Sequence, residues 1–259
     1  MKRQLRMAIE RVSRDLVFKR RLPSQFGKRP FFVTPGAALA YWRFDARTYD
    51  DFLYPLVERF VKRGDEVWDV GANVGLFALT AGAKGGRVLA FEPDVTLSSL
   101  IRRSADLAEN HDLQIDVLSA AISDRVDLAE LAIAQRGRAT NHLNTVQGST
   151  VTGGVRHEVT VLTLTLDWLL ARRQPPKLIK IDVEGAEALV FAGAQAVLAR
   201  ARPIIVCELF SRNMDGIAKL FAENDYVLFD AMHTSGELRP TDTPVTNTLA
   251  IPAEKVGGV

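Results

Sequence analysis

The chain has 259 residues, 47% of them hydrophobic and 25% charged, which is the composition of an ordinary globular protein with one large α/β domain or at most two small ones. It contains no internal repeat, no low-complexity tract and no run of about eighteen apolar residues, which argues against a repeat array or a membrane-spanning helix. The single cysteine, Cys207, cannot form an intramolecular disulfide, and we expect it to fill a buried strand. Without a secretory signal, the cytoplasm is the expected compartment.

The first 29 residues are strongly basic, with ten lysines and arginines against two acids, whereas the whole chain carries a net charge of only +2. Residues 2–20 are predicted to form a basic amphipathic helix, because apolar residues recur there at spacings of three and four. These apolar positions are Leu5, Ile9, Val12, Leu16 and Val17. Such a helix lies on the domain with a solvated face, or residues 1–29 make a peripheral contact with a membrane or another polyanion. Nucleic acid is not expected, because few aromatic residues accompany the charge.

We therefore divide the chain into a basic extension, residues 1–45 (amphipathic helix plus loop), and a main domain, residues 46–259. The domain begins with a predicted helix at 49–62, ended by Gly64. Strands are then predicted at 66–70, 87–91, 115–120, 177–181, 204–209, 226–230 and 248–251, and helices at 74–83, 97–109, 166–172, 187–198 and 217–224. This alternation predicts an α/β fold with a mostly parallel sheet, helices on both faces and an antiparallel strand at the C-terminal edge.

The alternation is interrupted between residues 124 and 165. Extended segments at 127–134 and 158–164 flank a stretch rich in Gly, Thr, Asn and Ser, residues 135–154, which is typical of a polar insertion or lid. His142 lies in it and is a candidate catalytic group if the insertion closes over the site. The alternative is an ordinary solvated histidine.

A glycine-rich turn, Asp69-Val70-Gly71-Ala72-Asn73-Val74-Gly75, connects the strand at 66–70 to the next helix. Glycine allows a sharp turn and a close ligand, and the helix beyond it offers free N–H groups. The pattern is neither the dinucleotide fingerprint nor the P-loop. An acid at the mouth of the loop repels phosphate but suits the ammonium group of a methionine moiety, so S-adenosylmethionine is the favoured ligand. The cofactor-binding candidates here are Asp69, Gly71, Ala72, Asn73 and Gly75.

Two further acidic clusters follow strands. Glu92, at the end of the strand at 87–91, is placed to accept both ribose hydroxyls of a cofactor, and Pro93 fixes the turn after it. Asp182 and Glu184 follow the strand at 177–181 and point to the same edge of the sheet, where ligands of open α/β sheets bind. Lys180 lies inside that otherwise apolar strand and requires an acidic partner.

Together these motifs resemble the FkbM-type methyltransferase family. The resemblance covers roughly residues 49–252 and rests on Asp69–Gly75, Phe91-Glu92-Pro93, Ala120-Ala121-Ile122-Ser123-Asp124, Lys180–Gly185 and Glu208. It implies a Rossmann-like class I methyltransferase fold with seven strands, S-adenosylmethionine as donor, and O-methylation of a sugar or natural-product hydroxyl. It adds Ala121 and Ile122 to the expected cofactor site.

For the chemistry, a hydroxyl acceptor needs a general base or a metal ion. The candidates for the base are Asp182, Glu184 and Glu208, with His142 as a further one, although Asp182 is also placed to hold the donor. A carboxylate-only magnesium site from the same three acids is an alternative. The acceptor is expected to be a small molecule, glycan or glycolipid. Two other classes remain: a non-catalytic S-adenosylmethionine-binding protein and a nicotinamide-dependent oxidoreductase on the same fold.

Overall fold

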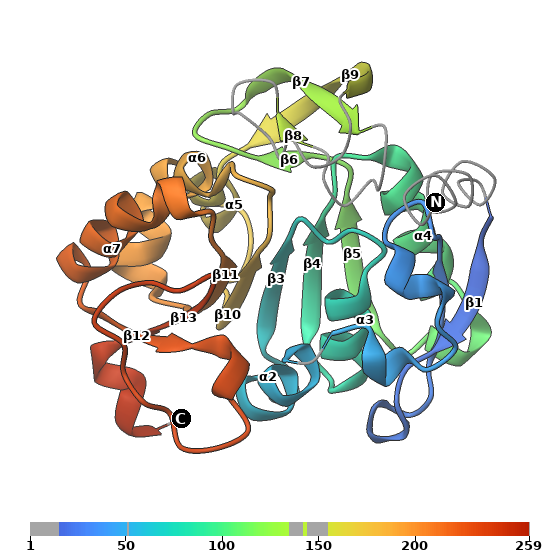
Figure 1. Cartoon of the computed structure of the whole chain (residues 1–259), viewed down its shortest axis with the longest axis horizontal. Helices are drawn as coiled ribbons and strands as arrows, with labels where there is room; N and C mark the ends of the chain where they lie inside the picture. Colours follow the sequence, from blue (N-terminus) through green and yellow to red (C-terminus); the bar gives the residue numbers. More distant parts are fainter. Residues whose placement is uncertain (1–15, 51, 135–141, 144–154, 259) are drawn as a thin grey trace, which may run out of the picture.

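The computed structural model describes residues 16–50, 52–134, 142–143 and 155–258, and a seven-stranded sheet forms its centre (Figure 1). The strands are β3 (Glu66–Val70), β4 (Arg87–Phe91), β5 (Gln114–Leu118), β10 (Leu178–Ile181), β11 (Ile204–Glu208), β12 (Tyr226–Asp230) and β13 (Asn247–Pro252). They are arranged in the order β12-β13-β11-β10-β3-β4-β5, and only β13 runs antiparallel to the others. The predicted α/β arrangement is confirmed, except that the antiparallel strand lies one position inside the edge.

Helices cover both faces of this sheet. Their bounds are α2 (Leu53–Phe60), α3 (Leu76–Ala83), α4 (Val95–Ala105), α5 (Leu166–Leu170), α6 (Glu187–Ala192) and α7 (Met214–Glu223). Strand residues alternate between two hydrophobic cores: Val67 and Val88 pack with α2, α3 and α4, whereas Trp68 and Leu89 pack with α5, α6 and α7. In the described part of the chain, no helix is long and apolar enough to cross a membrane.

The predicted helix at 187–198 is interrupted in the structure. Helix α6 ends at Ala192, and a π-helical turn follows at Val197–Ala201. A Cβ on Gly193 would lie 2.3 Å from the carbonyl oxygen of Ser123. The backbone at Gly193 therefore packs directly against the backbone at Ser123, which leaves no room there for a side chain. The carboxylate of Asp167 then accepts the N–H groups of two residues at the start of the second turn.

Helix α2 is also shorter than the predicted 49–62. The carboxylate of Asp50 accepts the backbone N–H of Leu53 at 3.1 Å and starts the helix there. The helix ends at Phe60, before Gly64, which turns the chain with a φ of 86°. The other predicted elements of the main sheet and its helices agree with the structure to within a few residues at their ends.

The prediction of a helix at 2–20 is wrong at its end, and residues 1–15 lie outside the described residues. Residues Phe18–Arg21 form strand β1, which pairs antiparallel with β2 (Pro30–Val33). Phe18 packs on Trp42 with ring centroids 5.2 Å apart, and β2 packs on α4. The pairing of β1 with a later segment therefore overrides the helical pattern of its apolar residues.

A second, four-stranded sheet lies above the carboxyl ends of β4 and β5 (Figure 1, top). It consists of β6 (Ala121–Ile122), β7 (Asp127–Ala134), β8 (His142–Leu143) and β9 (Val155–Leu164), in the order β6-β9-β7-β8. The extended segments predicted at 127–134 and 158–164 are confirmed. The polar stretch 135–154 lies outside the described residues except for β8.

Candidate active site

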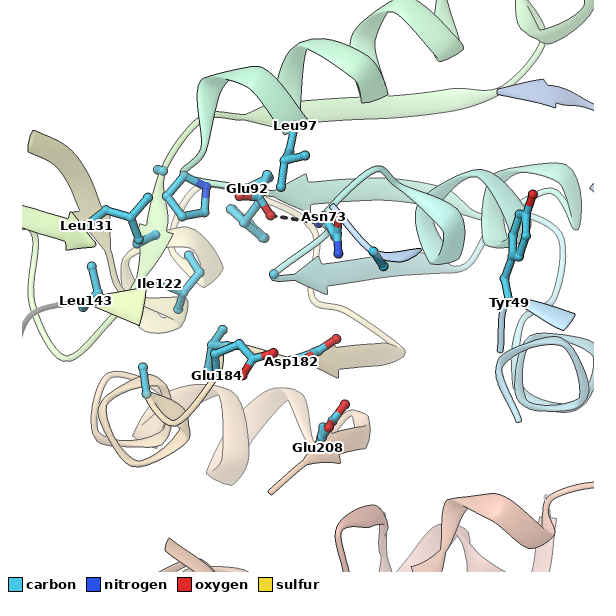
Figure 2. A pocket seen from close by; sticks show the side chains of 18 residues that line it. Tyr49, Asn73, Glu92, Leu97, Ile122, Leu131, Leu143, Asp182, Glu184 and Glu208 are labelled. Atoms are coloured by element: carbon cyan, nitrogen blue, oxygen red, sulfur yellow. Dashed lines mark hydrogen bonds between the residues drawn. The ribbon is translucent and has the colours of Figure 1, made fainter. Parts of the chain in front are cut away.

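A cavity of about 340 Å³ lies where the order of the parallel strands reverses, at the carboxyl ends of β3 and β10 (Figure 2). This position is the usual ligand site of open α/β sheets. Loops after β3, β4, β10 and β11 reach the cavity from the main sheet, and the small sheet contributes from above. The lining residues are Ala38, Tyr49, Gly71, Asn73, Phe91, Glu92, Pro93, Leu97, Ala120, Ala121, Ile122, Leu131, Leu143, Asp182, Val183, Glu184, Ala186 and Glu208.

Gly71 brings two of these loops into direct backbone contact. Its φ is 78°, and a Cβ at this position would lie 1.8 Å from the carbonyl oxygen of Asp182. The neighbouring loop therefore requires glycine here, and because Gly71 also lines the cavity, its contact with a cofactor stays a prediction. Gly75 begins α3 with a φ of 82°, and a Cβ there would meet Ile101 at 3.0 Å. Neither Gly75 nor Ala72 is among the residues that line the cavity.

Glu92 is buried at the cavity wall, where only 6% of its surface is exposed. Its carboxylate accepts the backbone N–H of Asn73 at 2.8 Å and that of Asp94 at 2.9 Å, one on each oxygen. Burial raises the pKa of Glu92 to about 8, although these two hydrogen bonds lower it. The carboxyl group is thus fixed in place between the loops that follow β3 and β4, next to Pro93.

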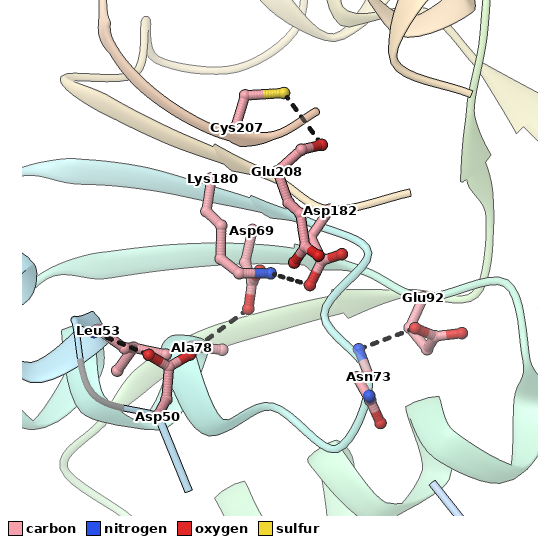
Figure 3. Close-up of polar contacts among 10 residues, drawn as sticks. All are labelled: Asp50, Leu53, Asp69, Asn73, Ala78, Glu92, Lys180, Asp182, Cys207 and Glu208. Carbon is pink, nitrogen blue, oxygen red and sulfur yellow. Dashed lines mark hydrogen bonds and ion pairs between the residues drawn. The ribbon is translucent and has the colours of Figure 1, made fainter. Parts of the chain in front are cut away.

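A buried ion-pair cluster lies beneath the cavity (Figure 3). The ammonium group of Lys180 lies 3.1 Å from Asp182 Oδ2 and 3.7 Å from Asp69 Oδ1, which confirms the predicted acidic partner for this lysine. Burial lowers the pKa of Lys180, but Asp182 and Asp69 outweigh it and hold this pKa above its usual value. The lysine thus stays charged and joins β3 to β10 at the floor of the site.

The prediction that Asp69 lies at the mouth of the loop is wrong. Asp69 is fully buried, does not line the cavity, and accepts the backbone N–H of Ala78 in α3 at 3.1 Å. Burial raises the pKa of Asp69 to about 6, against the lowering effect of Lys180. The side chain of an aspartate at the end of a buried strand can point toward the protein interior or toward the cavity. Here the Asp69 carboxylate points to the interior, where it lies near the ammonium group of Lys180.

The three carboxylates predicted as candidate bases all line the cavity, on the side opposite Glu92 (Figure 2). Burial and the charges of Asp182 and Glu208 raise the pKa of Glu184 to about 8. Glu208 lies at the more exposed rim, where desolvation and the charge of Asp182 raise its pKa to about 7. Glu184 also has a φ of 52°, a conformation that costs energy for a residue with a side chain. The wall therefore contains carboxyl groups that titrate near neutral pH.

Within the described residues, no three His, Cys, Asp or Glu side chains are grouped so that they could hold a metal ion. The candidate base His142 lies in strand β8, opposite Ala132, and its side chain is outside the described residues. Of the other predicted cofactor residues, Pro93, Ala121 and Ile122 line the cavity.

Several lining residues carry no motif and were missed in the sequence. Tyr49 and Ala38 come from the segment before α2, and Leu131 and Leu143 come from the small sheet. Tyr49 donates its hydroxyl to the carbonyl oxygen of Arg43 at 2.7 Å. For Leu131 the available signal is the apolar character of the predicted strand at 127–134, which indicates a buried face but does not say what it covers. Leu143 lies in the polar stretch 135–154, where the sequence gives no such signal.

The chain is similar to several known methyltransferases. A hexuronic acid methyltransferase, AglP of Haloferax volcanii, is 28% identical over 168 residues, which is 64% of this chain and 64% of that protein. Among solved structures, a methyltransferase FkbM from Methylobacillus flagellatus is similar with a TM-score of 0.43 and 17% identity, covering 72% of this chain and 43% of that one.

A second solved structure, the tRNA (uracil-54, C5)-methyltransferase of Pyrococcus abyssi in complex with S-adenosyl-L-homocysteine, has a TM-score of 0.45 and 14% identity and covers 90% of this chain and 43% of that one. The family model of the methyltransferase FkbM domain matches residues 69–232, which include the loops after β3, β4, β10 and β11 that form the cavity. The chain therefore belongs to the FkbM methyltransferase family.

Proposed function

We propose that this protein is an S-adenosylmethionine-dependent methyltransferase that methylates a hydroxyl oxygen of a sugar or sugar-like natural product. The observation that carries the proposal is the composition of the cavity: Glu92 and apolar residues line one side, and Asp182, Glu184 and Glu208 line the other. Such a cavity offers suitable groups for a donor on one side and for an acceptor on the other.

The donor side suits S-adenosylmethionine. Glu92 is fixed by two backbone N–H groups, and its remaining lone pairs are available to ribose hydroxyls. The apolar side chains of Leu97 and Ile122, with Pro93, suit an adenine ring. When bound, S-adenosylmethionine supplies a methyl group on a positively charged sulfur. A cavity lined by carboxyl groups favours that positive charge over a phosphate-bearing cofactor.

The acceptor side suits a hydroxyl. A hydroxyl is a weak nucleophile at neutral pH, and a base with a pKa close to 7 is the most effective at removing its proton. The raised pKa values of Glu184, about 8, and Glu208, about 7, place both groups in that range. AglP acts, by its name, on a hexuronic acid, which is an anion. The acidic wall here favours a neutral sugar hydroxyl over a uronate.

Binding tests the donor half of the proposal. Isothermal titration with S-adenosylhomocysteine at about pH 9, above the raised pKa of Glu92, is expected to give saturable binding that Glu92→Gln weakens at least about tenfold, because a neutral amide is a poorer acceptor for two hydroxyls than a charged carboxylate. Glu223→Gln is the matched control: Glu223 lies on α7 and has a 60% exposed side chain, paired with Lys219. If there is no binding, or if both variants behave alike, the cofactor assignment is wrong.

Methyl transfer tests the acceptor half. Release of S-adenosylhomocysteine is measured with neutral sugars, uronic acids and hydroxylated natural products as acceptors. Asp182→Asn is expected to abolish turnover, since this carboxylate joins the lysine cluster to the cavity wall. Full activity of that variant would remove Asp182 from the mechanism. Cofactor binding without turnover on any acceptor would identify a non-catalytic binding protein.

A further inference from the structure

One part of the surface combines exposed apolar side chains with cations, away from the cavity wall. We call it the aromatic–basic surface and define it as Leu16, Val17, Arg20, Trp42, Arg43 and Phe44. Phe44 is 88% exposed, the highest value among the large hydrophobic residues that the structure describes. Leu16 is 43% exposed, and Val17 and Trp42 are 40% exposed. Large apolar side chains so accessible to water cost free energy unless another surface covers them.

Two separate chain segments are fixed together to form this surface. The guanidinium group of Arg20 lies 4.9 Å from the ring centre of Phe18 and 4.9 Å from that of Phe44. Its Nε donates to the carbonyl oxygen of Arg43 at 3.1 Å. Phe18 in turn packs on Trp42. Phe18 and Arg20 of β1 therefore hold the loop at residues 42–44 in place, so that Trp42 and Phe44 are ordered before any partner arrives.

The charge of this region is positive. Lys19, Arg20 and Arg43 belong to it or adjoin it, and the nearby Asp45 is paired with Arg47 at 2.7 Å. The first 29 residues as a whole contain ten cations and two acids. Cations among exposed aromatic and aliphatic side chains fit the interface of an anionic bilayer, where the charges meet headgroups and the apolar groups enter the boundary with the acyl chains. A soluble polyanion has no apolar region that could bury Leu16 or Val17.

The surface is continuous with the rim of the cavity. The segment that carries Trp42 and Phe44 begins and ends at the lining residues Ala38 and Tyr49. Tyr49 also donates its hydroxyl to the carbonyl oxygen of Arg43, within the surface. A contact made by residues 42–44 is therefore mechanically linked to the cavity rim.

We propose that the aromatic–basic surface docks the protein on an anionic phospholipid bilayer and holds the cavity beside it. A sugar carried by a lipid is then the acceptor that this arrangement favours, provided that the proposed function holds. The docking itself does not require methyl transfer, so it is tested separately.

Co-sedimentation of the full chain with vesicles tests the docking. Vesicles of 30% phosphatidylglycerol in phosphatidylcholine are expected to bind the protein, and pure phosphatidylcholine or high salt to release it. Phe44→Ala and Arg43→Glu are each expected to lower the partition coefficient, by at least about tenfold when combined. Because Phe44 is almost fully exposed, its replacement removes the contact with the Arg20 guanidinium but leaves the buried core intact. Trp168→Ala is the matched control: Trp168 is 37% exposed with the guanidinium of Arg172 4.0 Å from its ring centre, but lies on α5.

Fluorescence gives a second readout. The chain has three tryptophans, and Trp68 is fully buried, so in a Trp168→Phe variant the exposed reporter is Trp42. Brominated lipids in anionic vesicles are expected to quench it. The proposal is overturned if anionic vesicles do not bind, if the Phe44 and Arg43 variants bind as the parent does, or if lipid does not quench Trp42. It is also overturned if heparin binds equally well and the same variants weaken it equally, because the surface is then a polyanion site. None of these outcomes alters methyl transfer to a soluble acceptor.

Discussion

Replacing Lys180 with methionine removes a cation that lies 3.7 Å from a fully buried carboxylate, that of Asp69, at the floor of the site. Methionine preserves the apolar length of the side chain but leaves the charge of Asp69 without compensation. Breaking a buried pair in this way costs about 3–5 kcal/mol of unfolding free energy. For a chain of this size each kcal/mol corresponds to about 2–4 °C, so the expected fall in Tm is roughly 10 °C.

The cost of this substitution is expected to depend on pH. Burial raises the pKa of Asp69 from 3.8 to about 6 even with Lys180 present, and without the lysine it rises further. A carboxyl group whose folded pKa is raised stabilises the fold at low pH, and this stabilisation is lost as the pH rises through the folded value. The Lys180→Met penalty should therefore be smaller at pH 5 than at pH 8.

Chemical denaturation at these two pH values measures the effect. Adding Asp69→Asn to the variant is expected to recover much of the loss, since the amide oxygen can still accept the N–H of Ala78. Lys219→Met is the control, because Lys219 and its partner Glu223 are 78% and 60% exposed, and such a pair contributes at most about 1 kcal/mol. A Lys180→Met penalty below about 1 kcal/mol that does not vary with pH would refute the reasoning.

Three further outcomes are expected. In Gly71→Ala the new Cβ would lie 1.8 Å from the Asp182 carbonyl oxygen. This variant should lower the free energy of unfolding by more than about 2 kcal/mol and abolish S-adenosylhomocysteine binding in titration. The control Gly216→Ala, whose Cβ would have nothing within 4 Å, should do neither. Because the pKa of Glu92 is raised from 4.5 to about 8, the ligand-free protein should lose stability across that range, at up to about 1.4 kcal/mol per pH unit. Glu92→Gln should flatten this slope, and an unchanged slope would mean that another group causes it. Asp167→Ala should cost about 1–2 kcal/mol in denaturation, because two backbone N–H groups lose their acceptor, and a neutral result would show that water replaces it.

The main sheet was predictable because its signals are local. Strands β3 and β4 are short apolar runs bounded by Gly, Pro and charged residues, and their predicted ends agree with the structure. Strand β1 was not predictable from local signals. Phe18 lies within the segment with a helical apolar pattern, and it forms a strand because it pairs with Val33, fifteen positions later. The break after α6 is equally non-local, because it depends on the carbonyl oxygen of Ser123.

In the candidate site too, features set by local sequence were predictable and those set by tertiary contacts were not. Glu92, Asp182 and Glu184 were predictable at the cavity because the end of a parallel strand determines which edge of the sheet a residue reaches. The orientation of Asp69 was not, because the sequence shows its position after β3 but not the ammonium group of Lys180 that holds it inside. Tyr49 lies in a segment that approaches the cavity only through tertiary packing.

The close approach of Gly71 to the Asp182 carbonyl oxygen has a consequence for how the two sides of the cavity respond to a ligand. The two loops touch without any compressible side chain between them, so neither can shift toward the other independently. We expect occupancy on the Glu92 side to alter affinity on the Glu184 side, and by thermodynamic reciprocity the reverse by the same factor. Titration of a ligand for one side in the presence of a ligand for the other would measure this factor.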